Sequence, residues 1–148
     1  MAVRTRKTKR RTVSQTTPRS QTARSLDHVP GCADLHEWPR RWMGFPEDIP
    51  PGETLVVCFR PFLQHLSERQ LSAKTIRKHV NNVWALGGEI IRGFNDTPSL
   101  RHAPIDALVF DAVEDGGLLP HGCDTEEELH SFESTCRLFR RFLEQQSR

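Results

Sequence analysis

Residues 59–94 have the sequence FRPFLQHLSERQLSAKTIRKHVNNVWALGGEIIRGF, in which two helical patterns meet at one turn. The apolar residues before the turn, spaced as on one face of a helix, are Leu55, Val56, Phe59, Phe62, Leu63 and Leu66. Those after the turn, with the same spacing, are Ile76, Val80, Val83, Trp84, Gly87, Ile90, Ile91 and Phe94. Ser72 can cap the second helix, and Leu71 can pack on Ile76. The stretch therefore predicts two amphipathic helices joined by a capped turn.

The opposite face of the second helix is basic and polar. It carries Lys74, Lys78, Asn81, Asn82 and Arg92, with Arg77 at its edge. Lys and Arg neutralise phosphates, and the free backbone amides at a helix start favour the same ligand. An asparagine there could bind an adenine edge if the helix enters the major groove. We therefore predict nucleic-acid contact through Lys74, Arg77, Lys78, Asn81 and Asn82, with a second cluster at Arg137, Arg140 and Arg141.

The first 24 residues contain eight Lys or Arg and no acidic residue. Because the whole chain carries a net charge of +2, the remaining residues carry −6. Residues 1–25 lack hydrophobic periodicity, so we expect a disordered tail that either stays solvated or follows a phosphate backbone. The residues predicted to contact nucleic acid in this arm are Arg6, Lys7, Lys9, Arg10 and Arg11.

Residues 26–52 are rich in proline, so we predict an irregular or extended segment. Its apolar residues are too many for a free linker and are expected to dock on the helical body; they are Trp38, Trp42, Met43 and Phe45. Residues 53–146 then form the helical domain. The chain of 148 residues suits one compact domain with tails.

Four helices are predicted in that domain, which makes the fold class an all-α bundle. The first spans residues 53–68, with a kink near 57–60 or a restart at Arg60 caused by Pro61. The second spans 73–93, where Gly87 and Gly88 permit a close approach of a neighbouring helix. The third spans 104–114, and the fourth follows a cap at Asp124 or Thr125. The fourth buries Leu129, Phe132, Cys136, Phe139 and Leu143.

Residue types that could perform catalysis or bind metal are scattered. His28, Cys32 and His36 recur every four residues, but Pro30 and Gly31 interrupt a helix there, so no metal site is predicted. An acidic patch on the third helix is expected to be solvated; it consists of Asp106, Asp111, Glu114 and Asp115. No phosphate-binding glycine-rich loop and no nucleophile-elbow sequence is present. We predict no cofactor.

An apolar helix is followed by Leu-Ser-x-x-Thr-Ile at residues 71–76 and then by a basic–apolar helix. This order resembles the helical core-binding domain of tyrosine recombinases, the phage integrases. The resemblance covers about residues 53–146. It implies a DNA clamp of about four helices that precedes a catalytic domain. The chain has no Tyr, so the family's covalent nucleophile is missing and no catalytic role is carried over.

The leading hypothesis is a non-enzymatic module that binds double-stranded DNA, an orphan or truncated relative from a mobile element that could also recruit a recombinase. The alternative is a protein-interaction or regulatory module that docks through residues 38–45 or the acidic third helix. A small hydrolase is a third hypothesis. Because no apolar run approaches the roughly 18 residues of a membrane span and no secretory signal is present, we expect a cytoplasmic location. The oligomeric state stays open.

Overall fold

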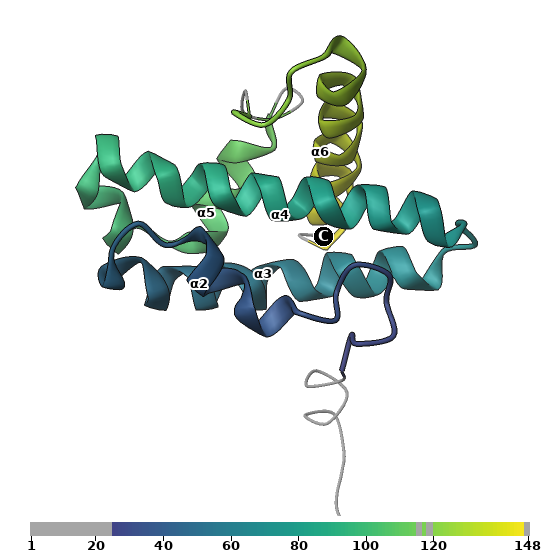
Figure 1. Cartoon of the computed structure of the whole chain (residues 1–148), viewed down its shortest axis with the longest axis horizontal. Coiled ribbons are helices and arrows are strands. Elements are labelled where there is room, and N and C mark those ends of the chain that lie inside the picture. Colours follow the sequence, from purple (N-terminus) through teal and green to yellow (C-terminus); the bar gives the residue numbers. More distant parts are fainter. Residues whose placement is uncertain (1–24, 115–116, 118–119, 147–148) are drawn as a thin grey trace, which may run out of the picture.

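The computed structural model describes residues 25–114, 117 and 120–146, which form an all-helical fold (Figure 1). Its elements, with η for a 3-10 helix, are η2 (Leu35–Glu37), α2 (Trp38–Trp42), η3 (Pro46–Asp48), α3 (Ile49–Glu68), α4 (Ala73–Asp96), η4 (Pro98–His102), α5 (Ile105–Ala112) and α6 (Glu126–Gln146). The predicted all-α fold class is confirmed. The predicted disordered tail falls mostly on residues 1–24, which lie outside the described residues.

Two helix starts are fixed by side-chain caps. The backbone amide of Thr75 donates to the hydroxyl of Ser72 at 3.1 Å, which confirms the predicted cap of α4. At α6 the amide of Glu128 donates to the Thr125 hydroxyl at 3.1 Å. The Glu128 carboxylate in turn accepts from the amides of Asp124 and Thr125, as in a capping box. These caps set where α4 and α6 begin.

Helix α3 begins at Ile49, four residues before the predicted start, with prolines in its first turn, where no amide partner is needed. It then continues through Pro61 as one helix, so the predicted restart at Arg60 is wrong. Phe59 and Phe62, on either side of Pro61, are both fully buried. Their burial offsets the cost of the proline, roughly 3 kcal/mol in a helix interior.

The segment 26–52 is more ordered than predicted, because it contains η2, α2, η3 and the start of α3. Trp38 and Trp42 are buried, as predicted, and belong to the same core cluster as the long helices. Met43 and Phe45 are 43% and 51% exposed, so their predicted docking is wrong. Residues of this segment that share the core include Leu26, Val29, Cys32 and Leu35.

The core lies where α3, α4 and α6 meet. Helices α3 and α4 run antiparallel in Figure 1, and α6 crosses them steeply. Phe62 of α3 stacks on Phe139 of α6 with ring centroids 4.3 Å apart. Phe142 is also buried, whereas the predicted core residues Leu129 and Leu143 are only half-buried. This packing covers one side of α4 and leaves its opposite side in solvent.

Candidate nucleic-acid interface

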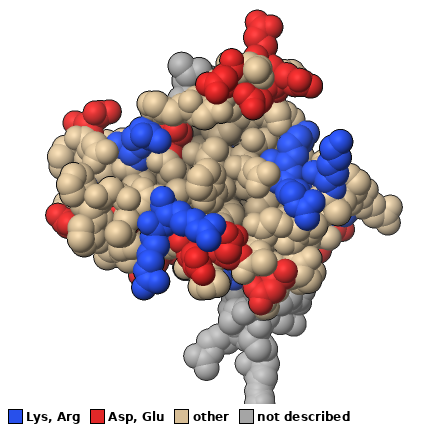
Figure 2. Space-filling model, in the orientation of Figure 1, with Lys and Arg blue, Asp and Glu red and all other residues tan. Residues whose placement is uncertain are grey.

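The start of α4 presents a cluster of cations, which we call the α4 basic cluster and define as Lys74, Arg77 and Lys78. All three side chains are exposed, as is Asn81 one turn later. Within residues 25–114, 117 and 120–146, none of the three forms an ion pair. Figure 2 shows Lys and Arg gathered at the right, over the end of the molecule where α4 begins. The cluster is therefore available to an anionic ligand.

The backbone of α4 adds to this positive character. The first amides of a helix lack internal acceptors, and the helix dipole favours negative charge there. Ser72 accepts from the amide of Thr75, and the amides of Ala73 and Lys74 have no acceptor among the described residues. The preceding turn adds the exposed Arg69, which the sequence reasoning missed. Its position shortly before the predicted cap at Ser72 could have indicated that Arg69 belongs to this basic region.

Asn82 lies differently from its neighbour Asn81. The Asn82 amide nitrogen donates to the Thr135 hydroxyl at 2.8 Å and to the carbonyl and hydroxyl of Ser131 at 3.2 and 3.1 Å. The side chain is half-buried and ties α4 to α6. Its donors are therefore used inside the protein, and of these two neighbours only Asn81 has an exposed amide for a base edge. Because the burial of His79 was not itself predicted, its spacing of three residues from Asn82 gave no signal of this role.

His79 belongs to the same buried polar network. It is 7% exposed, and its Nδ1 lies 2.7 Å from the Thr135 hydroxyl oxygen. Burial lowers the pKa of His79, and the nearby charges of Lys78 and Arg69 lower it further. The neutral ring is therefore favoured in the folded protein, close to the charges of Lys78 and Arg69.

This lowered pKa predicts that stability decreases on acidification. Below about pH 6.5, the ordinary pKa of histidine, the unfolded chain binds a proton at His79 more readily than the folded chain does. The contribution of His79 to the free energy of unfolding is therefore fully present above that pH and is lost as the pH falls. Between pH 7.5 and pH 5.5, the free energy of unfolding measured in urea should decrease less for His79→Gln than for the parent. An equal loss in both proteins would contradict the assignment.

The second predicted cluster, on α6, is partly neutralised by acidic side chains. Arg140 is 25% exposed, lies over the Phe110 ring at 4.6 Å, and pairs with Glu144 at 3.2 Å and Glu114 at 3.9 Å. Arg137 pairs with Glu133 at 4.0 Å. Arg141 is exposed and forms no ion pair within the part of the chain that the structure describes. The α6 arginines thus present less unpaired charge than the α4 basic cluster.

Trp84 was predicted to face the core, and this is wrong. Its side chain is 41% exposed, whereas the flanking apolar residues Val83 and Leu86 are buried. Trp84 follows Lys74 by ten residues and Asn81 by three, so it lies on the exposed face of α4. An apolar residue at the edge of a helical pattern cannot be assigned to the core from periodicity alone, because the covering elements decide its burial.

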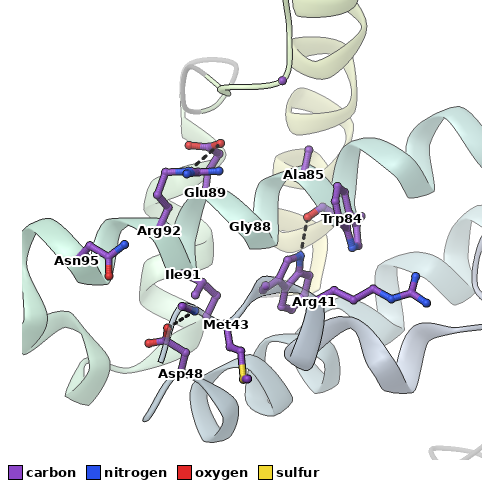
Figure 3. A pocket seen from close by; sticks show the side chains of 13 residues that line it. Arg41, Met43, Asp48, Trp84, Ala85, Gly88, Glu89, Ile91, Arg92 and Asn95 are labelled. Atoms are coloured by element: carbon purple, nitrogen blue, oxygen red, sulfur yellow. Dashed lines mark hydrogen bonds and ion pairs between the residues drawn. The ribbon is translucent and has the colours of Figure 1, made fainter. Parts of the chain in front are cut away.

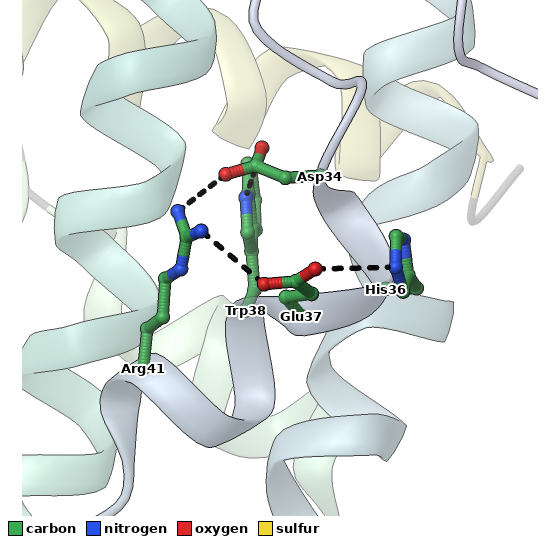
Figure 4. A network of polar contacts seen from close by, with 5 residues as sticks. All are labelled: Asp34, His36, Glu37, Trp38 and Arg41. Atoms are coloured by element: carbon green, nitrogen blue, oxygen red, sulfur yellow. Dashed lines mark hydrogen bonds and ion pairs between the residues drawn. The ribbon is translucent and has the colours of Figure 1, made fainter.

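Two of the residues considered as metal ligands, His36 and Cys32, have surroundings that do not favour metal binding. His36 pairs with Glu37 at 3.6 Å, and Glu37 also contacts Arg41 (Figure 4). Burial raises the pKa of the Cys32 thiol to about 12, so the metal-binding thiolate is disfavoured at neutral pH. Among the described residues no group of three or more His, Cys, Asp or Glu side chains is arranged to bind a metal ion.

We find no matching family model, no matching curated protein and no matching solved structure for this chain. The resemblance to recombinase core-binding domains therefore stays a prediction. None of the described helices combines the length and the apolar character needed to cross a membrane. The predicted cytoplasmic location is not tested by these findings.

Proposed function

We propose that the protein is a non-catalytic DNA-binding module that contacts duplex DNA through the start of α4. The proposal depends on one observation, the exposure of Lys74, Arg77 and Lys78 without ion pairs among the described residues. Cations without an internal partner can neutralise phosphates and release counterions at no structural cost. The side chain of Asn81 is placed beside them for a base edge.

Two features of the sequence extend this proposal. The arm of eight Lys or Arg would add contacts that follow the backbone without reading sequence. The absence of Tyr leaves the chain without the nucleophile of a tyrosine recombinase, which favours binding without catalysis. A relative of a recombinase core-binding domain would have this combination.

Replacing Lys74, Arg77 and Lys78 together by Ala is expected to weaken duplex binding and its salt dependence. Three lost phosphate contacts lower the slope of log affinity against log salt by about 2.7. Between 50 and 200 mM salt, this corresponds to a roughly 40-fold smaller loss of affinity than in the parent. Fluorescence anisotropy on a labelled random duplex measures both quantities.

A charge-matched control is the Arg137, Arg140 and Arg141 triple Ala variant, which removes the same number of cations from α6. Because two of these arginines are paired internally, we expect a smaller decrease in affinity and slope. Deleting residues 1–24 should weaken binding to all duplexes alike. Far-UV circular dichroism confirms that each variant is folded. If the α4 triple variant binds DNA as the parent does, α4 is not the contact surface.

A second candidate function is a protein-interaction module, favoured by the exposed Met43 and Phe45 in the segment that was predicted to dock on a partner. Size-exclusion chromatography with light scattering separates the two candidates. A tight oligomer that does not bind DNA at 50 mM salt would favour protein interaction.

A further inference from the structure

A cavity of about 390 Å³ opens to solvent along α4, beyond the α4 basic cluster. One wall is α4 itself, the other is formed by the end of α2 and the segment that follows it, and Gly122 also contributes to the lining. In Figure 3 Trp84 and Arg41 lie at one end, and Arg92 and Asn95 lie at the other. The volume is within the range of sites that bind small ligands. The cavity was not predicted from the sequence, because its two walls are distant in the chain.

Trp84 gives this cavity an aromatic surface on the same exposed face as the α4 basic cluster. Its side chain is 41% exposed, compared with 2% for Trp38 and 9% for Trp42. At 1.5 Å per residue, Trp84 lies about 9 Å along the helix axis from Lys78 and about 15 Å from Lys74. These separations correspond to about three and four base steps of a DNA strand. A single strand could therefore contact the cations and the indole together.

The charges around the cavity are balanced, which distinguishes it from a phosphate site. Arg41 pairs with Asp34 and Glu37, as Figure 4 shows. Arg92 pairs with Glu89 at 3.7 Å, and Asp48 pairs with Arg101 at 2.9 Å. An anion would have to displace these carboxylates. A neutral planar ligand with donors and acceptors would not, and the exposed amide of Asn95 offers both.

Trp42 holds one part of the cavity wall in place. The indole nitrogen of Trp42 donates to the Trp84 carbonyl at 2.9 Å. Its ring also makes edge contacts with Trp38 and Phe59, with centroids 5.7 and 6.1 Å apart. Gly88 lines the cavity without a side chain. A preformed site of this kind loses little conformational entropy on binding.

We propose that this cavity binds an unpaired nucleobase, stacked on Trp84, from a DNA strand whose phosphates lie on Lys74, Arg77 and Lys78. Stacking on an aromatic side chain requires a base that has left the duplex stack. The inference rests on the proposed DNA-binding function and specifies its substrate: DNA with a bulged, mismatched or single-stranded base is preferred over fully paired duplex.

Fluorescence anisotropy with two labelled probes tests the preference, namely a 30-base-pair duplex and the same duplex with three central mismatches. We expect the parent to bind the mismatched probe at least about fivefold more tightly, the lower end of what one stacked base contributes. Trp84→Ala should reduce this ratio to about one and leave affinity for the paired duplex unchanged. Trp84→Phe retains an aromatic face and should keep much of the preference.

Two further measurements distinguish the outcomes. Gly88→Leu places a side chain in the cavity while keeping Trp84, and should also abolish the preference. In the parent the mismatched probe should quench tryptophan fluorescence, and Trp84→Ala should lose that quenching. Equal binding of both probes by the parent, or an unchanged ratio in Trp84→Ala, overturns this inference and leaves the proposed function standing. Failure to bind either probe overturns both. A dimer that Trp84→Ala dissociates, without DNA binding, would identify the cavity as a protein-docking surface instead.

Discussion

Asp48→Asn is expected to destabilise the protein by about 3 kcal/mol, because it breaks a buried ion pair and leaves one partner behind. The carboxylate is 1% exposed and accepts from the Arg101 guanidinium at 2.9 Å. It also accepts from the backbone amides of Gly44 and Phe45 at 2.9 and 3.1 Å. The Arg101 side chain is only 17% exposed, so its charge would remain mostly desolvated and unpaired.

The direction of the Asp48 pKa shift agrees with a stabilising ion pair. Burial would raise the pKa, but the amide of Gly44, the Arg101 guanidinium and the amide of Phe45 together lower it below its ordinary value. A carboxyl with a lowered folded pKa contributes stability above its unfolded pKa and loses it as the pH falls through the folded value. The parent should therefore lose stability in acid partly through Asp48, and Asp48→Asn should show a smaller loss.

Urea unfolding at pH 7 measures the effect, and the exposed neighbour provides a matched control. Glu47→Gln removes the same charge one residue earlier and is expected to change stability by no more than about 0.5 kcal/mol. The Asp48→Asn and Arg101→Gln double variant should be less destabilised than the two single changes added together. Strictly additive effects would show that the pair does not act as a unit.

Local features of the sequence predicted the helices well. The cap at Ser72 and the apolar spacing around Val80 and Val83 depend only on neighbouring residues, and both predictions are confirmed. The basic face of α4 was predicted on the same grounds. Which residues belong to that face was not predicted fully, because Asn82 bonds to α6 and Trp84 faces solvent. Those outcomes depend on where another helix crosses α4, and periodicity within α4 does not contain that information.

Contacts between distant residues account for the rest of what was missed. Arg101 reaches Asp48 across 53 positions of the chain, and Arg140 reaches Glu114 and Phe110 from another helix. A count of arginines on α6 therefore overestimated its unpaired charge. The cavity beside Trp84 has the same origin, since α2 and α4 form it only after folding.

Gly87→Ala is expected to destabilise the protein by about 2 kcal/mol, although Ala is the better helix former. A Cβ at Gly87 would lie 2.3 Å from Cζ2 and 2.6 Å from Cη2 of Trp42, far inside contact distance. The indole cannot retreat easily, because its nitrogen donates to the Trp84 carbonyl and its ring contacts Phe59. Overpacking a core typically costs about 1–3 kcal/mol. The close approach predicted from the glycine pair is thus confirmed, with α2 as the neighbour.

Two other glycines of α4 provide matched controls for this change. A Cβ at Gly93 meets nothing within 4 Å, so Gly93→Ala should stabilise the protein by roughly 0.5–1 kcal/mol through helix propensity alone. A Cβ at Gly88 would lie 3.4 Å from Trp42 Cδ1, which is ordinary contact, so Gly88→Ala should fall between the other two. Urea midpoints of the three variants should follow that order. If Gly87→Ala were as stable as Gly93→Ala, Trp42 would not be packed against α4, and the rigid wall inferred for the cavity would be lost with it.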